Sequence, residues 1–160
     1  MKPPYHLAQV NIAKARAAMD TPEMQGFVEQ LDYINQLAER SPGFVWRLQT
    51  DAGDATSLQL FDDPLVIMNC SVWESLEALQ DYVYSGEHLT VLKNKKNWFE
   101  KIAGPALALW WVPAGHIPSA EAARDAIHQL QQQGPSAAVF SFAKPYPMPD
   151  ADASQTLHYG

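Results

Sequence analysis

One uninterrupted run in the middle of the chain constrains the fold more than any other feature. Residues 66–73 are predicted to form an apolar strand that ends in a large aromatic side chain, Trp73. Ser75 follows as a candidate N-cap and Glu77 lies in the first turn, so a helix is predicted to begin at once. His88 stands at the start of a second helical stretch. The run indicates a strand–helix unit, without naming a substrate.

Bulk composition limits the class of protein. The chain has 160 residues, 47% of them hydrophobic and 18% charged, which suits one domain with a real core. No apolar run approaches a membrane span and the N-terminus lacks a signal-peptide core, so a cytoplasmic protein with no membrane partner is predicted. A net charge of −7 argues against nucleic acid as a partner. The single cysteine, Cys70, excludes an intrachain disulfide, and its mid-strand place favours a small buried hydrophobe over a catalytic thiol.

The order of predicted elements is β-α-β-β-α-β, followed by an extra C-terminal helix and strand. This order is typical of an α+β, ferredoxin-like domain with an antiparallel sheet. Residues 1–143 are predicted to form that single domain, and residues 144–160 a Pro-rich tail. The predicted strands are 5–13, 44–50, 66–73, 106–113 and 138–142, with a strand or loop at 56–61; the predicted helices are 21–39, 75–84, 87–99 and 119–133.

The second face of such a sheet is too apolar to be left in water. Helices of a ferredoxin-like fold cover one face only, and the other must carry Trp46 or Val45, Trp73, and Trp110 or Trp111. A large exposed apolar face implies a partner. Two sheets packed face to face would bury it and enclose a cavity, so a homodimer is predicted.

Four short motifs carry a resemblance to a known family. They are residues 6–11 (His-Leu-Ala-Gln-Val-Asn), 41–48 (Ser-Pro-Gly-Phe-Val-Trp-Arg-Leu), 72–75 (Val-Trp-Glu-Ser) and 109–116 (Leu-Trp-Trp-Val-Pro-Ala-Gly-His). With them the chain resembles an uncharacterised family of the dimeric α/β-barrel superfamily, which includes antibiotic-biosynthesis monooxygenases and heme-degrading monooxygenases. The resemblance implies a dimeric α/β barrel and a small oxidoreductase of the monooxygenase type.

The resemblance also implies site residues. Heme-degrading relatives use an asparagine on the first strand, a tryptophan at the end of the third and a histidine on the next helix. Asn11, Trp73 and His88 are the positions that match, although the gap from Trp73 to His88 is longer than in that pattern. Cofactor-free relatives also place polar side chains in this cavity. No cofactor is therefore the first expectation, with heme as the alternative.

Three side chains are the candidates for catalysis. His88 is the candidate acid/base, because imidazole titrates near neutral pH; a helix-start histidine exposed to solvent is the alternative. Asn11, with Gln9 beside it on the same strand face, can orient a carbonyl or stabilise an oxyanion, or instead bond within the dimer interface. Trp73 offers a flat wall for an aromatic ligand, or simply packs in the core.

A further set of side chains is predicted to bind substrate. Arg47 must find a carboxylate or water, so it binds an anionic group or forms a salt bridge to Glu74 or Asp62. Asn69 and Ser71 share a strand face with Trp73 and extend its wall. The remaining members are the tryptophans Trp46, Trp98 and Trp110.

Several chemistries have no sequence support. No His, Cys and carboxylate cluster has metal-site spacing, and no phosphate-binding loop, nucleophile elbow or dinucleotide fingerprint occurs. Two functions of different class stay open. One is an enzyme acting on a hydrophobic aromatic or polyketide-like molecule; the other is a non-catalytic protein that binds a small molecule, with heme among the candidates.

Overall fold

The computed structural model describes residues 4–48, 61–93 and 95–149. Parts of the predicted strands 44–50 and 56–61 and of the predicted tail lie outside these residues. The elements in chain order are β1 (Tyr5–Ala15), the 3₁₀ helix η1 (Pro22–Met24), α1 (Gln25–Arg40), β2 (Phe44–Arg47), β3 (Val66–Trp73), α2 (Leu76–Val83), α3 (Gly86–Leu92), α4 (Lys95–Trp98), β4 (Phe99–Glu100), β5 (Leu107–Pro113) and α5 (Ala120–Gln133).

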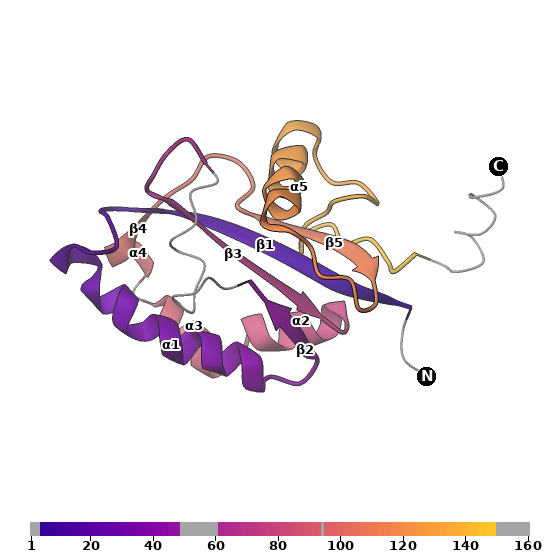
Figure 1. Cartoon of the computed structure of the whole chain (residues 1–160), viewed down its shortest axis with the longest axis horizontal. Coiled ribbons are helices and arrows are strands. Elements are labelled where there is room, and N and C mark those ends of the chain that lie inside the picture. The colour runs from indigo at the N-terminus through magenta and orange to yellow at the C-terminus, as the bar shows by residue number, and fades with distance from the viewer. Residues whose placement is uncertain (1–3, 49–60, 94, 150–160) are drawn as a thin grey trace.

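The sheet has the strand order of a ferredoxin-like domain. β1 lies between β3 and β5, and β2 pairs with the outer edge of β3, with every pairing antiparallel (Figure 1). The short β4 pairs with the end of β1. The order β5-β1-β3-β2 confirms the predicted α+β fold class.

Serine caps fix the starts of three helices. Ser75 accepts a hydrogen bond from the Ala78 N–H at 3.0 Å, and Ser119 accepts one from the Ala122 N–H at the same distance, as predicted. Ser85 caps α3 in the same way through the His88 N–H at 3.2 Å. These bonds satisfy backbone donors that the first helical turn leaves without a partner.

Two predicted helices differ from the structure. The helix predicted from Thr21 begins with the 3₁₀ turn η1, because the Thr21 hydroxyl donates to the Ala18 carbonyl at 2.6 Å instead of capping. The helix predicted over 87–99 is wrong at its end: α3 and α4 are separate, and Phe99 already belongs to β4. Phe99 and Glu100 leave the helix to pair with Ala15 and Lys14 of β1.

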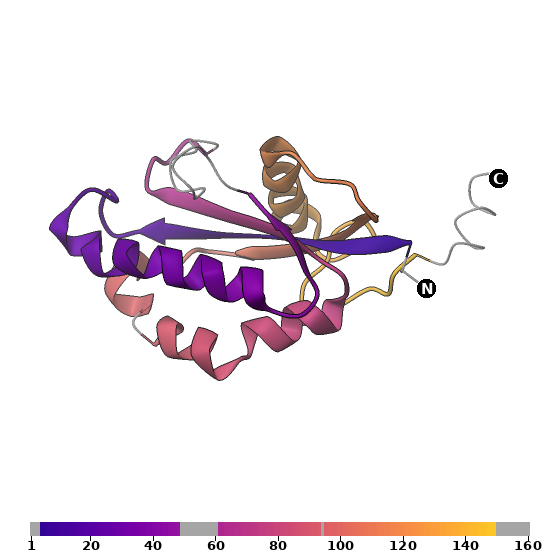
Figure 2. The same ribbon diagram turned by 60° about the horizontal axis from the view of Figure 1, so that its bottom comes forward.

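The two faces of the sheet are both covered by helices, as Figure 2 shows. The network face, under α1 and α2, carries Leu7, Gln9 and Asn11 of β1 with Asn69, Ser71 and Trp73 of β3. The α5 face carries Ala8, Val10 and Ile12 of β1 with Met68, Cys70 and Val72 of β3. Alternation along each strand separates the two sets.

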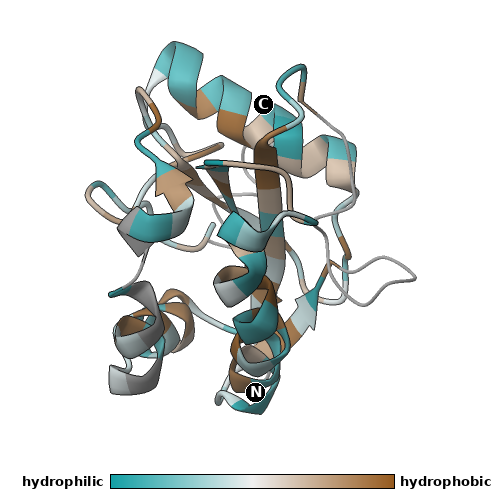
Figure 3. Ribbon diagram, turned by 90° about the vertical axis from the view of Figure 1, so that its left-hand side faces the viewer, coloured by the Kyte–Doolittle hydropathy of each residue, from teal (hydrophilic) through white to brown (hydrophobic). Residues whose placement is uncertain are grey.

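Helix α5 packs on the face that the sequence analysis left to a partner. Its buried side chains are Ala123, Ala126, Ile127 and Leu130, and they contact the α5 face of the sheet. Figure 3 shows the hydrophobic residues of α5 turned toward the sheet. The prediction of a bare face is therefore wrong, because α5 of the same chain packs on it. Trp73 was also predicted there, but it lies on the network face. The homodimer stays a prediction.

The chain after α5 returns to the network face along the edge of β5. Phe140 forms one bridge with Leu109, in place of the strand predicted over 138–142. The Trp111 indole N–H then donates to the Tyr146 carbonyl at 3.1 Å. Phe140 and Tyr146 pack against each other with ring centroids 5.9 Å apart. The first part of the Pro-rich tail thus contacts its own domain.

Candidate functional site

Five side chains of β1 and β3 form one polar network on the network face. The Gln9 amide nitrogen donates to Ser71 Oγ at 2.7 Å and to Asn69 Oδ1 at 2.8 Å. The Trp73 indole N–H donates to Ser71 Oγ at 2.8 Å. The Asn11 amide nitrogen donates to Gln9 Oε1 at 3.1 Å and Asn69 Oδ1 at 3.4 Å. The register pairs Gln9 with Ser71 and Asn11 with Asn69, which is why the two strands can build it.

Some donor and acceptor groups of the network are not used within it. Ser71 Oγ accepts from both Gln9 and Trp73, so its own hydrogen remains to donate. Asn69 Oδ1 accepts two bonds, which leaves the Asn69 amide N–H groups. Asn11 uses its amide nitrogen twice and keeps its carbonyl oxygen. Within the described part of the chain, no hydrogen bond is made by these three groups, so the network presents two donors and one acceptor to a ligand.

Burial within the network changes along the strands. Trp73 has no exposed surface, Gln9 is 3% exposed and Ser71 is 6% exposed. Asn11 is half-buried and Asn69 is exposed. This arrangement suits a binding site: the buried, hydrogen-bonded end of the network holds its geometry, and the exposed end admits a ligand.

Trp73 holds the network in place and has no free face to offer as a wall. Its ring packs edge-on against Phe44, with centroids 5.5 Å apart, and stacks on Tyr82 at 5.1 Å. Tyr82 is a residue that sequence reasoning missed. Its spacing of three from Leu79 on α2 was the available signal, since it places both on the inward side. Burial raises the pKa of Tyr82 to about 12, so this ring stays neutral.

His88 lies one ring farther from the network. Its ring contacts Tyr82 with centroids 4.8 Å apart, and its Nδ1 lies 2.9 Å from the Val83 carbonyl. A carbonyl only accepts, so Nδ1 carries the proton and Nε2 is left with a lone pair. Burial lowers the pKa of His88, and the bond to Val83 opposes that only in part. The ring is therefore a neutral base at neutral pH, and Tyr82 separates it from Trp73.

Arg47 makes the predicted kind of contact with a different partner. Its Nε donates to Glu39 of α1 at 2.9 Å, where the sequence analysis expected Glu74 or Asp62. Arg47 pairs with Ser71 across β2 and β3, so it shares the network face. The side chain is only 11% exposed, and its bond to Glu39 places it in the wall between sheet and helix.

The other predicted tryptophans do not join the network. Trp46 pairs with Val72, and Trp110 with Ala8, so both lie on the α5 face. The reason for Trp46 is alternation along the strand, because Trp46 and Arg47 are consecutive and must face opposite sides of the sheet. Trp98 packs with Met24 beyond the end of β1. Cys70 also lies on the α5 face, and burial raises its pKa to about 12, which is typical of an inert thiol.

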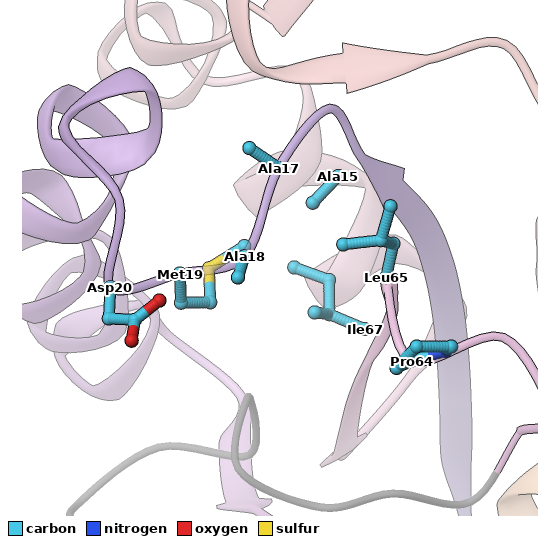
Figure 4. Close-up of a pocket in the computed structure, with 8 residues that line it drawn as sticks. All are labelled: Ala15, Ala17, Ala18, Met19, Asp20, Pro64, Leu65 and Ile67. Carbon is cyan, nitrogen blue, oxygen red and sulfur yellow. The ribbon is translucent and has the colours of Figure 1, made fainter.

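A pocket of about 370 Å³ lies on the network face beyond the polar residues. Figure 4 shows Met19 and Asp20, before α1, across from Leu65 and Ile67. Ile67 is two residues from Asn69 on the same strand face. A second, smaller pocket of about 210 Å³ shares Met19 and Asp20 with it.

Among the described residues, no three His, Cys, Asp or Glu side chains are placed to hold a metal ion.

The sequence matches the family described as domain of unknown function DUF3291 over residues 6–156. The chain belongs to the DUF3291 family. This membership confirms the predicted assignment to an uncharacterised family. No protein of curated function matches this DUF3291 chain.

Three solved structures illustrate what the DUF3291 chain is similar to. SnoaB from Streptomyces nogalater, a cofactor-independent oxygenase, is 16% identical with a TM-score of 0.49, over 71% of this chain and 98% of SnoaB. NE2512 from Nitrosomonas europaea, of unknown function, is 12% identical with a TM-score of 0.49, over 72% and 97%. Rv0793 from Mycobacterium tuberculosis is 11% identical with a TM-score of 0.45, over 72% and 98%.

In the part of the DUF3291 chain that the structure describes, no helix is both long and apolar enough to cross a membrane.

Proposed function

We propose that this protein is a small oxidoreductase of the monooxygenase type. Its substrate is a hydrophobic aromatic or polyketide-like molecule that lies on the network face, and it needs no resident cofactor. The observation that carries the proposal is the set of unused groups on Ser71, Asn69 and Asn11. They sit together on a sheet face whose other side chains are largely apolar.

The two donors suit a substrate that becomes an anion. An enol or phenol loses a proton to water, and the Ser71 hydroxyl and the Asn69 amide donate to the oxygen that carries the charge. The Asn11 carbonyl can accept from a second hydroxyl of the substrate. The anion is electron-rich and reduces O₂ directly: a ring CH₂ becomes C=O with one oxygen atom, and the other oxygen leaves as water with both hydrogens. Trp73 acts here as a positioning residue, through its bond to Ser71.

The sequence predicts His88 as the base, and its variant separates that prediction from the form proposed here. Its neutral Nε2 can accept a proton, but Tyr82 lies between His88 and Trp73. We propose that the network binds and orients the substrate anion without contact from His88. Turnover by His88→Ala within threefold of wild type is then expected, and loss of turnover would return the base to His88.

Heme does not fit this arrangement. The resemblance would place it between His88 and Trp73, since those are the matching positions. The Tyr82 ring fills that space, stacked on Trp73 and in contact with His88. The His88 Nε2 lone pair alone does not make room for a flat macrocycle, so no step of the proposal uses heme.

Oxygen uptake tests the proposal. Purified protein is supplied with anthrone, naphthohydroquinone and related hydroxyaromatic compounds, and O₂ consumption is followed with an electrode. Saturable uptake is expected in wild type. Asn69→Asp keeps the Oδ acceptor and removes the donor, so at least a tenfold loss is expected. Asn97→Asp, at an exposed asparagine, is the matched control. Equal uptake by Asn69→Asp and wild type would refute the assignment.

The alternative is a protein that binds without catalysis. The complete burial of Trp73 favours it, because a ring with no exposed surface stabilises the domain whether or not chemistry occurs. Saturable ligand binding with no O₂ consumption for any compound would select this function. A homodimer is part of the proposal on the strength of the family resemblance, and sedimentation velocity measures it.

A further inference from the structure

The network and the larger pocket lie on one continuous strip of the sheet. The cross-strand pairs on the network face run from Gln9 with Ser71, through Asn11 with Asn69, to Ala13 with Ile67. Each step is two residues, or about 7 Å. Ile67 is itself part of the pocket wall. The exposed amide of Asn69 therefore lies one such step along the strand from the pocket wall.

We infer that the pocket is the apolar half of a single binding site whose polar half is the network. The inference rests on the proposed function and names its substrate class. The ligand is a flat, neutral aromatic ketone or phenol. Its oxygen end contacts the Asn69 amide and the Ser71 hydroxyl, and its ring system extends over Ile67 between Met19 and Leu65.

The pocket has the size and the lining that such a ring system needs. Its volume of about 370 Å³ lies within the roughly 300–1,000 Å³ of small-molecule sites. Three alanines, Ala15, Ala17 and Ala18, leave the space open, and Met19, Leu65 and Ile67 supply apolar contact. A methionine adapts to the outline of an aromatic ligand.

Charge at the rim selects among aromatic ligands. Asp20 is the charged side chain of the pocket lining and is exposed, and Figure 4 shows it next to Met19. A carboxylate there repels a ligand with an acidic tail and tolerates a neutral or basic one. The proposed site is thus apolar in the middle, with hydrogen-bond donors at the end of Asn69 and Ser71 and a carboxylate at the end of Asp20.

A fluorescent ketone tests this assignment on the full chain. The probe is 6-propionyl-2-(dimethylamino)naphthalene, whose emission shifts to the blue in apolar surroundings. Binding with a blue shift is expected. Ala17→Phe and Ala18→Phe fill the pocket and should each weaken binding at least tenfold. Ala122→Phe, on the exposed side of α5, is the control and should bind as wild type. Far-ultraviolet circular dichroism checks that each variant is folded; Ala18 is exposed, so its variant keeps the test valid if Ala17→Phe does not fold.

Two analogues locate the ends of the ligand. 2-(Dimethylamino)naphthalene lacks the ketone, so its affinity should be insensitive to Asn69→Ala, which weakens the ketone at least tenfold. An analogue of the ketone probe that carries a carboxymethyl group on its amine nitrogen places an acidic group at the other end, and Asp20→Asn should strengthen its binding. Equal sensitivity of both neutral probes to Asn69→Ala would overturn the orientation.

The failure of this inference differs from the failure of the proposed function. A probe that does not bind, or that binds both pocket-filled variants as tightly as wild type, overturns the pocket assignment even when O₂ uptake depends on Asn69. Binding that follows the stated pattern with no O₂ uptake for any compound supports the site and rejects the oxygenase.

Discussion

Trp73 donates its indole N–H to Ser71, two residues back on the same face of β3, at 2.8 Å. Gln9 donates to the same oxygen from β1 at 2.7 Å. Both lone pairs of the hydroxyl are then used, and the direction of its hydrogen follows. A buried tryptophan with no exposed surface thus decides what a neighbouring serine offers to a ligand.

Replacing Trp73 with phenylalanine removes that N–H while keeping an aromatic ring. We expect a loss of about 1–2 kcal/mol in the free energy of unfolding, from one buried hydrogen bond and some ring packing. Binding of the ketone probe should weaken at least fivefold, because the Ser71 hydroxyl loses one of its two donors and is free to rotate away from the ligand. Trp111→Phe is the control: it loses a comparable bond to the Tyr146 carbonyl, away from the network. Unchanged probe affinity in Trp73→Phe would contradict the positioning role.

The pKa of His88 should lie below its ordinary value of 6.5, because burial disfavours the charged ring. The unfolded chain then takes up a proton first as the pH falls below about 6.5. As the pH falls from 6.5 to the lower pKa of the folded state, protonation of this side chain in the unfolded chain therefore lowers the free energy of unfolding. Above pH 6.5 the side chain makes no pH-dependent contribution. Proton NMR of the ring resonances gives the pKa, and urea unfolding of His88→Gln should lack this part of the pH dependence. A measured pKa above 6.5 would show that the ring is charged and paired in the folded state.

Hemin should not form a specific complex. The Tyr82 ring occupies the space between His88 and Trp73, so titration is expected to give no saturable, one-per-chain Soret shift. Tyr82→Ala is the informative variant, because it removes the ring that fills the space. A stoichiometric shift in wild type that is lost in His88→Ala would overturn this expectation and identify a heme protein.

Truncation of Ile127 tests whether α5 covers its own sheet. Ile127 has no exposed surface and packs on the α5 face, so Ile127→Ala should cost about 2–4 kcal/mol in the free energy of unfolding. Leu89→Ala, at a side chain that is 44% exposed, should cost less than about 1 kcal/mol. Chemical unfolding monitored by tryptophan fluorescence compares the two. A small effect at Ile127 would reopen the α5 face to a second copy of the chain.

Much of the local structure was predictable because it depends on neighbours in sequence. The apolar run of β3 matches its predicted bounds, and the caps at Ser75 and Ser119 form as expected. Alternation along the strands was also sufficient to group Gln9 with Asn11, and Asn69 with Ser71. The end of the helix at Trp98 was not predictable in this way, because pairing of Phe99 with Ala15 competes with the helix.

The sequence by itself determined which side chains share a strand face, the fold class and the family to which the chain belongs. Only the tertiary structure decided that Gln9 faces Ser71, that Trp46 and Trp110 lie across the sheet from them, and that Tyr82 separates His88 from Trp73. The physical reason is that alternation and capping are set by adjacent residues. Register between strands and the contacts of one helix with the sheet are set by packing of the whole core.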